Sequence, residues 1–306
     1  MDSTVDIIKL NRMENMNHQS LYHKRSSISE TFLYGLIYGS ASISVLLLIG
    51  IIGYVFAKGY KTINMEFLTS VTSALKGTTG IAGNIINTLY IILLTLIVAV
   101  PLGVGSAVYL NEYAKRGRLV SIIEFTTQTL SGIPSIIFGL FGMVFFGTTL
   151  HMGYSIMTGS LTLAIMVLPL ITKNTQEALK TVPDSYRSGA LGIGATKWYM
   201  IRTIILPSAM PGIVTGVILA IGRIVGESAA LLFTAGSGYT LPKVAQGYLS
   251  KIMESGGTLT IQLYLSMSKG QYNVAFGIAV VLLAIVLIIN ILTKILARKL
   301  DVNNRK

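Results

Sequence analysis

Six long runs of apolar residues dominate the pattern along this chain, and polar residues gather in the segments between them. Each run can supply the roughly 20 apolar residues that a membrane-spanning helix needs. The runs cover residues 32–56, 83–109, 121–147, 156–176, 209–233 and 273–294. The pattern therefore predicts an all-α membrane protein with six transmembrane helices.

Polar tails flank the apolar part of the chain. Residues 1–30 precede the first run and residues 301–306 follow the last, so we expect one transmembrane domain over residues 31–300. No small-residue cleavage pattern follows the first run, which favours a retained helix over a signal peptide. Residues 236–272 are expected to form an external loop with a short amphipathic helix around 242–254.

Proline and glycine fall inside two of the runs. Pro101 to Gly105 lies in the second run, and Gly132 to Pro134 lies in the third. Such breaks are tolerated in a membrane where neighbouring helices or water satisfy the freed backbone groups. We expect both segments to interrupt their helices.

The composition agrees with a membrane protein and narrows its chemistry. Hydrophobic residues make up 52% of the chain and charged residues only 12%, against about 25% charged in a soluble domain. The absence of cysteine excludes disulfide bonds and thiolate metal sites. The histidines, His18, His23 and His151, are scattered, so we expect no metal site.

The positions of the basic residues predict the orientation. The chain has 24 Lys and Arg residues; with a cytoplasmic N-terminus, 17 of them lie on the cytoplasmic side and 6 on the other. Cytoplasmic segments of membrane proteins carry such an excess. Both termini and the 177–207 segment are therefore expected in the cytoplasm, and the net charge of +12 serves orientation rather than nucleic-acid binding.

The 177–207 segment is long and polar for a loop between two spans. Pro183 and Asp184 favour the start of a helix, and Gly192 and Gly194 favour its end. Thr196 is a suitable N-cap for a second short helix, and Pro207 and Pro211 bound the following run. The apolar residues Trp198, Tyr199, Met200 and Ile201 indicate a partner surface rather than a simple connection.

Two other interpretations of this segment are weaker. A helix, a glycine turn and a helix also describe a DNA-binding motif, but here the motif is tethered between two spans. Gly189 to Lys197 faintly resembles a phosphate-binding loop, yet no Gly-Lys-Ser/Thr tripeptide is present and no strand precedes it. We expect no ATP binding by this chain.

Spacing within the segment resembles the EAA loop of ABC-transporter permeases, which reads Glu-Ala-Ala, three residues, Gly, nine residues and Ile-any-Leu-Pro. Ser188-Gly-Ala190, Gly194 and Ile204-Ile-Leu-Pro207 stand at these positions. Further similarity lies in Pro101-Leu-Gly-Val-Gly105, Tyr109-Leu-Asn-Glu-Tyr113, Ser131-Gly-Ile-Pro-Ser135 and Arg223-Ile-Val-Gly-Glu-Ser-Ala-Ala230. Together these motifs are similar to the PstA family of permease subunits of bacterial phosphate ABC transporters.

The resemblance implies a type I ABC importer permease (MetI-like) fold in the bacterial cell membrane. It also implies a PstC-like second permease, a PstB-like ATPase dimer that binds ATP and Mg, and an extracellular PstS-like phosphate-binding protein. The chain itself would be no enzyme and hold no cofactor. The residues implied in contact with the ATPase are Ser188, Gly189, Ala190, Gly194, Thr196, Lys197, Trp198, Ile204, Leu206 and Pro207. Ser188 replaces the usual Glu, which puts in doubt any salt bridge made there.

Arg223 and Glu227 are charged residues in the middle of the fifth run, and their spacing of four predicts one helix face. A charge near the bilayer centre costs at least about 2.5–3.5 kcal/mol. One interpretation is a structural ion pair. The other is a phosphate-binding position in the pathway, in which the Arg223 guanidinium binds phosphate oxygens. Phosphate retains a proton and can donate it in a hydrogen bond to Glu227, whereas sulfate cannot, so Glu227 would favour the protonated anion and weaken its retention.

Other functions fit the sequence less well. A PstC-type permease, or a permease for molybdate or sulfate, is the alternative within the same class. A secondary transporter would require inverted repeats with broken helices, and none is convincing. A membrane enzyme would require clustered catalytic groups, whereas the charged residues within the runs, Glu124, Lys173, Arg223, Glu227 and Lys294, form no nucleophile–base pattern in the sequence.

Overall fold

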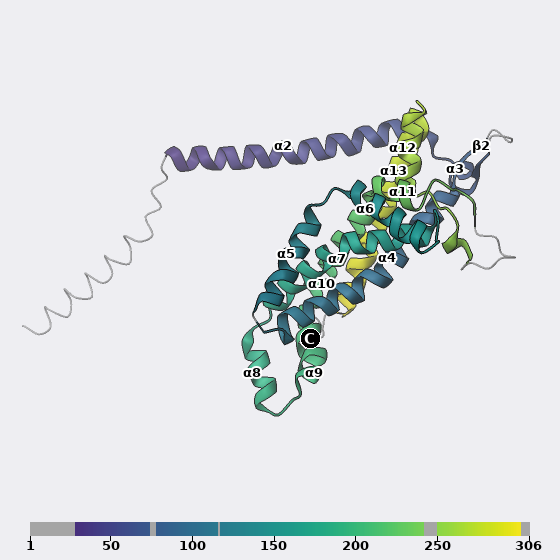
Figure 1. Cartoon of the computed structure of the whole chain (residues 1–306). Helices are drawn as coiled ribbons and strands as arrows, with labels where there is room; N and C mark the ends of the chain where they lie inside the picture. The colour runs from purple at the N-terminus through teal and green to yellow at the C-terminus, as the bar shows by residue number, and fades with distance from the viewer. Residues whose placement is uncertain (1–27, 74–77, 116, 242–249, 301–306) are drawn as a thin grey trace, which may run out of the picture. The chain divides into compact units, whose positions relative to one another are not determined.

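A computed structural model describes residues 28–73, 78–115, 117–241 and 250–300 of the chain. Helices dominate this part, and a single short β-hairpin accompanies them among the described residues (Figure 1). The longer helices are α2 (Ile28–Gly59), α4 (Ala82–Val108), α5 (Arg118–Gly132), α7 (Ile156–Lys180), α10 (Leu206–Gly226), α12 (Leu259–Ser268) and α13 (Tyr272–Leu300).

Shorter elements connect them. The short α-helices are α3 (Met65–Thr69), α6 (Ser135–Gly142), α8 (Asp184–Gly192), α9 (Lys197–Met200) and α11 (Ala229–Thr234). Strands β1 (Val71–Ser73) and β2 (Thr78–Ile81) pair antiparallel, with Val71 opposite Ile81. The 3-10 turns are η1 (Tyr60–Thr62) and η6 (Ser250–Met253), and the π-helical turns are η2 (Tyr109–Tyr113), η3 (Met143–Thr149) and η4 (Ile201–Ile205).

The described residues hold five helices long and apolar enough to cross a membrane, or six when a bent pair counts as one span. The bent pair is the third apolar run, where α5 and the helix over Ser135–Thr149 meet at 102°. Pro134 adopts φ −57° and ψ 138° at this corner, so its ring ends one helix and begins the next. The expected interruption at Gly132–Pro134 is confirmed, and so is the all-helical six-run architecture.

Two expectations about helix ends are wrong. Pro101 lies inside α4 without ending it. Likewise, Pro207 and Pro211 do not separate the loop from the fifth run, because one helix continues from Lys197 to Gly226. The π-helical turn η4 ends at Ile205, two positions before Pro207, and the altered hydrogen-bond pattern of such a turn accommodates a residue that has no N–H to donate.

The expected amphipathic helix around 242–254 falls partly on residues 242–249, which lie outside the described residues. Its remaining part forms the 3-10 turn η6. The structure instead places α12 in this loop, capped by Thr258, whose side chain accepts a hydrogen bond from the Ile261 N–H.

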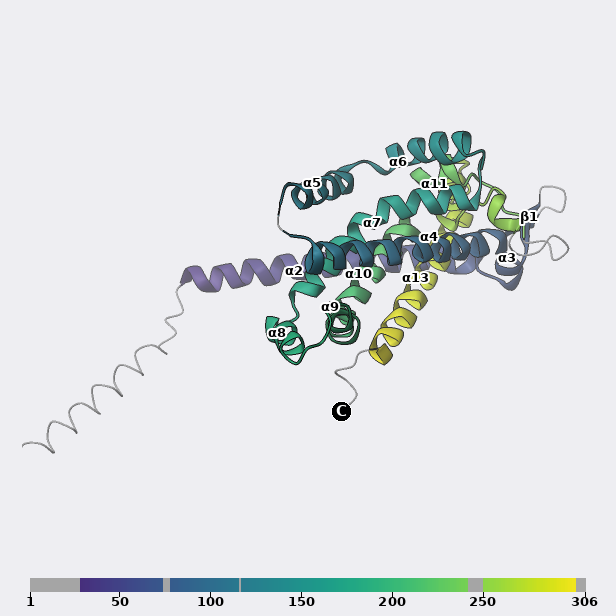
Figure 2. The ribbon, with the colours of Figure 1, turned by 60° about the horizontal axis from the view of Figure 1, so that its bottom comes forward.

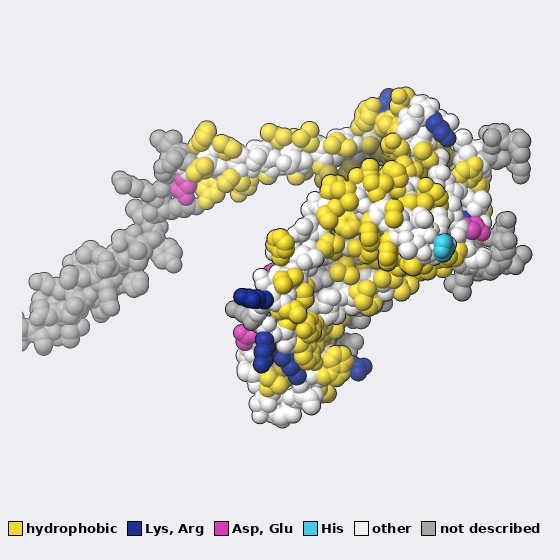
Figure 3. Space-filling view, in the orientation of Figure 1, with side chains coloured by type: hydrophobic (Ala, Val, Ile, Leu, Met, Phe, Trp, Pro, Cys, Tyr) yellow, Lys and Arg dark blue, Asp and Glu magenta, His cyan; other side chains and the backbone are white. Residues whose placement is uncertain are grey.

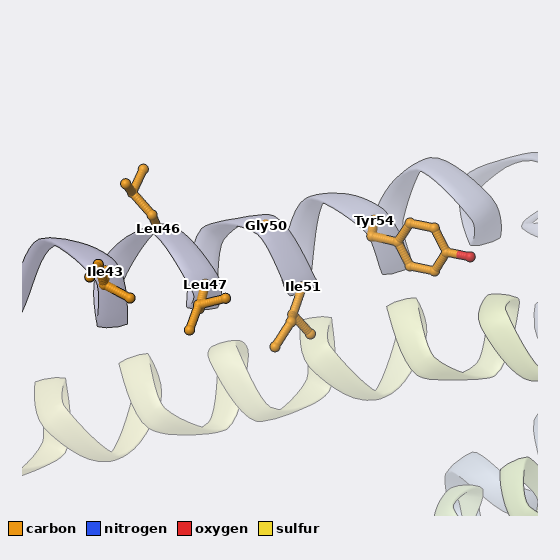
Figure 4. Close-up of a pocket in the computed structure, with 6 residues that line it drawn as sticks. All are labelled: Ile43, Leu46, Leu47, Gly50, Ile51 and Tyr54. Carbon is orange, nitrogen blue, oxygen red and sulfur yellow. The ribbon is translucent and has the colours of Figure 1, made fainter. Parts of the chain in front are cut away.

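Two compact units are described separately, residues 1–54 and residues 55–306. The described part of the first unit is α2 up to Tyr54, a helix that is apolar along its length. Six of its residues line a shallow apolar hollow of about 440 Å³, and Figure 4 shows how these residues lie along the helix. These residues are Ile43, Leu46, Leu47, Gly50, Ile51 and Tyr54.

The core of the second unit lies where α7 packs against both α4 and α10. Side chains such as Leu163, Ile171 and Ile224 are fully buried there. Helix α10 runs antiparallel to α7, because Gly212 lies against Ala178 and Gly216 lies against Asn174. Glycine at these two positions allows the helix backbones to approach closely, as small residues do between membrane helices.

Gly139 offers a direct test of this close packing, because a Cβ there would lie 2.8 Å from the Ala230 Cα atom of α11. Backbone atoms cannot turn aside as a side chain can, so we expect Gly139→Ala to destabilise the protein by about 1–3 kcal/mol. Gly105→Ala is the matched control: Gly105 is also helical, but nothing lies within 4 Å of its Cβ position. That control should be neutral or stabilising by up to about 1 kcal/mol. Thermal unfolding of both variants in detergent measures the difference, and equal midpoints would contradict this packing.

Candidate functional site

Helices α8 and α9 form a hairpin at one end of the second unit, well away from α3 and the β-strands (Figures 1 and 2). We call residues 184–200 the α8–α9 hairpin. Helix α8 begins directly after Pro183 and ends at Gly192, and Gly194 adopts φ +85° in the turn, as glycine readily does. The Thr196 side chain accepts a hydrogen bond of 3.3 Å from the Tyr199 N–H. The predicted helix start, glycine turn and threonine cap are confirmed.

Exposed apolar side chains cover the outer surface of the hairpin. Ile193 at its turn is 87% exposed, and Trp198 and Tyr199 are 62% and 58% exposed. Basic side chains gather over the same end of the unit in the space-filling view, whereas yellow hydrophobic side chains cover much of the middle (Figure 3). Exposed apolar groups surrounded by charged ones are typical of a protein–protein contact.

Arg187 anchors the hairpin to the rest of the unit. Its Nε and Nη2 atoms donate to the carboxylate of Glu112 in η2, the turn that continues α4, with the shortest distance 2.8 Å. Nη2 also donates to the Leu179 carbonyl at 2.9 Å, and Nη1 donates to the Val182 carbonyl at 2.8 Å and to Asp184 Oδ1 at 3.0 Å. All of the N–H donors of the guanidinium therefore have partners.

This ion pair is largely removed from solvent. The Glu112 side chain is 4% exposed and the Arg187 side chain 18% exposed. Asn111 donates a further hydrogen bond of 2.8 Å to Glu112. The hydrogen bond to Glu112 raises the pKa of Arg187 above its usual value, so the guanidinium remains charged at any pH at which the protein is folded. One residue of α8 is thereby fixed to the ends of both α4 and α7.

An apolar groove of about 700 Å³ lies beside the hairpin, between α4 and the continuous α9–α10 helix. Tyr109, Tyr113, Trp198 and Met210 contribute to its walls. The Lys197 Nζ atom lies 5.0 Å from the centre of the Tyr113 ring, a cation–π contact. Trp198 thus contacts a groove as well as solvent. Ile193 does not line the groove, so it is the better residue with which to test the outer surface of the hairpin.

The predicted coupling residues divide into two groups. Ser188, Gly189, Gly194, Thr196, Lys197 and Trp198 are exposed on the hairpin. The others are buried or half-buried and support it: Ala190, Ile204, Leu206 and Pro207. The Ser188 hydroxyl donates to the Asp184 carbonyl of its own helix at 3.1 Å, so it occupies the position of the usual Glu without offering a charge.

The expectation that Arg223 and Glu227 share a helix face is wrong. Helix α10 ends at Gly226, and Glu227 adopts the extended backbone values φ −82° and ψ 125°. The Glu227 side chain turns toward α11, where its Oε1 atom accepts a hydrogen bond of 3.1 Å from the Ala230 N–H. The fifth apolar run is therefore broken here into α10 and α11.

Arg223 and Glu227 also form no ion pair with one another; the ion pairs among the described residues involve other side chains. Glu227 is 7% exposed, and the Thr260 hydroxyl of α12 donates to its carbonyl oxygen at 3.0 Å. Arg223 is exposed, on the last turn of α10. Its guanidinium is thus free to meet a ligand or another subunit, whereas the Glu227 carboxylate caps a helix.

Reasoning from the sequence missed the Arg187–Glu112 pair and the exposure of Ile193. Glu112 did carry a signal, because it is the one acidic residue in the motif that closes the second apolar run. Arg187 carried none that separates it from the other basic residues of the loop. Only the fold brings together two residues that are 75 positions apart.

Comparisons with known proteins agree with this architecture. Residues 99–302 match the family described as binding-protein-dependent transport system inner membrane component. The probable ABC transporter permease protein YqgI of Bacillus subtilis is 37% identical over 206 residues, which cover 67% of this chain and 69% of that protein.

Two further relatives carry names that include a substrate. The phosphate transport system permease protein PstA of Haemophilus influenzae is 30% identical over 267 residues, which cover 86% of this chain and 92% of that protein. The PstA homolog of Mycoplasma pneumoniae is 34% identical over 259 residues, which cover 83% of this chain but only 37% of that longer protein.

Among solved structures, a chain of a bacterial alginate ABC transporter, crystallised with an alginate-bound periplasmic protein, matches with a TM-score of 0.66. The match covers 90% of this chain and 96% of that one at 15% identity. At this identity the likeness shows a shared fold.

Proposed function

The chain belongs to the binding-protein-dependent transport system inner membrane component family, and on that premise we propose that it is the permease subunit of an ATP-driven importer of inorganic phosphate. It forms part of the translocation pathway and contains no ATPase of its own. A separate ATPase subunit binds ATP and Mg and drives transport.

One observation carries the coupling part of this proposal: the α8–α9 hairpin presents exposed apolar side chains on a braced support. An ATPase that changes conformation on ATP binding can move the permease only through a contact surface that is itself rigid. The Arg187–Glu112 pair, shielded from solvent, supplies this stiffness by fixing α8 to α4 and α7. Ile193, Trp198 and Tyr199 supply the contact area.

Charge supports the orientation that this role requires. Basic residues are concentrated in the sequence segments at the hairpin end, including Lys180, Arg187, Lys197 and Arg202, and this excess supports a cytoplasmic position for the hairpin and both termini. Helix α12 and the β-hairpin then face outward, toward an extracellular phosphate-binding protein of the PstS type. A second permease of the PstC type completes the pathway, and a PstB-type ATPase pair contacts the two hairpins.

Phosphate as the substrate rests on two supports. Relatives at 30–34% identity are named phosphate transport permeases. Arg223, exposed at the end of α10, offers planar paired donors that suit phosphate oxygens. A PstC-type role, or transport of another oxyanion such as molybdate or sulfate, is the alternative.

Reconstitution tests the proposed function directly. The chain, its second permease and the ATPase pair are placed in vesicles with the phosphate-binding protein, and ATP hydrolysis and uptake of labelled phosphate are measured. We expect phosphate, and not sulfate, to stimulate both. Stimulation by sulfate or molybdate alone would assign the chain to the alternative substrate, and hydrolysis by this chain without partners would refute the assignment of the ATPase to another subunit.

Ile193→Asp tests the contact surface on the hairpin. Burying a carboxylate in an apolar interface without a partner costs several kcal/mol, so the ATPase should no longer co-purify with the permease. Met253→Asp is the matched control, because Met253 is 53% exposed at the end proposed to face outward. Retention of the ATPase by Ile193→Asp, or its loss in both variants, would contradict the surface assignment.

A further inference from the structure

A polar cleft of about 420 Å³ lies between α5 and α7. Both helices belong to the membrane part of the chain, yet this cleft is lined mainly by hydroxyl, amide and charged side chains. The polar groups that the argument uses are Glu124, Gln128 and Ser131 on α5 and Lys173, Gln176 and Lys180 on α7.

The polar residues of α5 form a stripe along one side of that helix. Glu124, Gln128 and Ser131 follow one another at spacings of four and three, which places them on a single face. Other positions carry Ile122 and Phe125, which are 63% and 70% exposed and suit lipid or an apolar partner. Polar residues in a membrane helix are costly and generally face a water-filled path or a protein interior. The stripe therefore indicates a hydrated space on the α7 side of α5.

Lys173 is the unpaired cation of this cleft. Lys180 forms an ion pair of 3.0 Å with Glu177. Lys173 forms no ion pair or hydrogen bond with any of the described residues, and Glu124 faces the same space from α5. The free ammonium group, the amides and the hydroxyl of this cleft can donate hydrogen bonds to an anion. The Glu124 carboxylate can accept a hydrogen bond from a hydroxyl group on that anion.

The helix register places Lys173 between the hairpin and Arg223. Lys180 and Lys173 are separated by seven residues of α7, or about 10 Å along the helix. Asn174 lies against Gly216 of α10, and Arg223 is seven residues, again about 10 Å, further from the hairpin. Cations thus recur at similar intervals from the hairpin end toward the middle of the bundle.

We propose that the α5–α7 cleft binds protonated inorganic phosphate on the cytoplasmic side of Arg223, with Lys173 as the main donor and Glu124 accepting a hydrogen bond from the hydroxyl group of the anion. This proposal rests on the proposed function and adds a second phosphate-binding site to the translocation pathway. Phosphate near neutral pH still carries a hydroxyl group that can donate a hydrogen bond to a carboxylate, whereas sulfate carries none. The nearby Glu124 and Glu177 charges keep the anion weakly held, as release requires.

Cysteine labelling tests this site, because the chain contains no cysteine of its own. Ser131→Cys places a thiol in the cleft. Thr129→Cys is the matched control: it makes the same change of hydroxyl to thiol two residues away, at an exposed position that does not line the cleft. Each variant is assembled with its partner subunits in phosphatidylcholine nanodiscs, and the rate of reaction with an anionic methanethiosulfonate is measured.

We expect phosphate at about ten times its dissociation constant to slow labelling of Ser131→Cys about tenfold, because only about a tenth of the sites stay free. Sulfate should have no effect, and Thr129→Cys should react at the same rate throughout. Lys173→Gln added to Ser131→Cys should abolish the protection. Equal protection by sulfate, or protection that survives Lys173→Gln, would overturn the proposal.

A second arm separates free phosphate from a lipid phosphate headgroup. If phosphatidylglycerol nanodiscs alone slow the labelling of Ser131→Cys, the cleft holds lipid and the proposal is overturned. The readout is binding, so it is independent of uptake. If the complex imports phosphate but phosphate does not slow labelling of Ser131→Cys, the cleft site alone is refuted. If phosphate slows the labelling but is not imported, the proposed function is refuted and the binding site remains.

Discussion

Replacing Arg187 with alanine is expected to destabilise the protein by about 3–5 kcal/mol, because it leaves the Glu112 carboxylate shielded from solvent without its ion-pair partner. The Glu112 side chain is only 4% exposed, and the carbonyls of Leu179 and Val182 each lose the hydrogen bond from Arg187 in the same change. The α8–α9 hairpin should loosen first, since Arg187 is its link to α4. Trp198, the single tryptophan of the chain, lies in the hairpin and reports this loosening by fluorescence during denaturation with sodium dodecyl sulfate.

Lys180→Ala provides the control for Arg187→Ala. The Lys180–Glu177 pair is close in space to the same helix end, but its side chains are 56% and 63% exposed. An exposed pair contributes below about 1 kcal/mol, so this variant should unfold almost as the wild type does. Arg187→Lys should recover only part of the loss, because an ammonium group cannot reach three helix ends as the guanidinium does. Equal stability of Arg187→Ala and Lys180→Ala would show that the pair does not brace the hairpin.

Replacing Arg223 with glutamine is expected to lower the initial rate of phosphate uptake about tenfold or more, because charge-assisted hydrogen bonds contribute about 1.5–3 kcal/mol each. The change should leave the fold intact, since Arg223 is exposed and makes no ion pair with the described residues. Arg223→Lys keeps the charge but loses the planar fork, so its uptake should fall between that of the wild type and of Arg223→Gln. Wild-type uptake by both variants would remove Arg223 from the pathway.

Glu227 requires a pair of variants, because its carboxylate also caps α11. Glu227→Gln keeps an oxygen that can accept the Ala230 N–H and removes only the charge. Glu227→Leu removes the acceptor as well and should cost about 0.5–2 kcal/mol, the usual effect of losing a cap. If Glu227 acts on the substrate, Glu227→Gln alone should change the discrimination between phosphate and sulfate. A change in stability without any change in transport would leave Glu227 as a cap only.

The order of helices followed from the sequence because apolar runs of this length have few alternatives. The threonine cap at Thr196 and the turn at Gly194 also followed, since each depends on a few neighbouring residues. The end of α10 did not. Nothing in the local pattern of residues 223–230 shows that Glu227 leaves the helix, because that conformation depends on Thr260, 33 residues away, and on the packing of α11 against α6.

Proline was the least reliable guide in this chain. Pro134 ends a helix, whereas Pro101, Pro207 and Pro211 lie within helices. The difference is one of environment: a neighbouring π-helical turn or a close-packed helix can satisfy or rearrange the freed carbonyl. Likewise, the polar cleft between α5 and α7 requires a knowledge of which faces meet, and a single sequence does not give it.

The helix that enters the bundle from the hairpin continues without a break for 30 residues, from Lys197 to Gly226. At 1.5 Å per residue it is a rod of about 45 Å, and Arg223 lies on its last turn. In the proposed transporter, a tilt imposed on the hairpin by the ATPase would therefore be transmitted mechanically along the whole rod. It would end at Glu227, where the chain turns and α11 stays with α6. The hairpin and Arg223 thus lie at opposite ends of one helix. In the proposed transporter, each ATP-driven tilt of this helix would change the side of the membrane to which the Arg223 guanidinium is accessible.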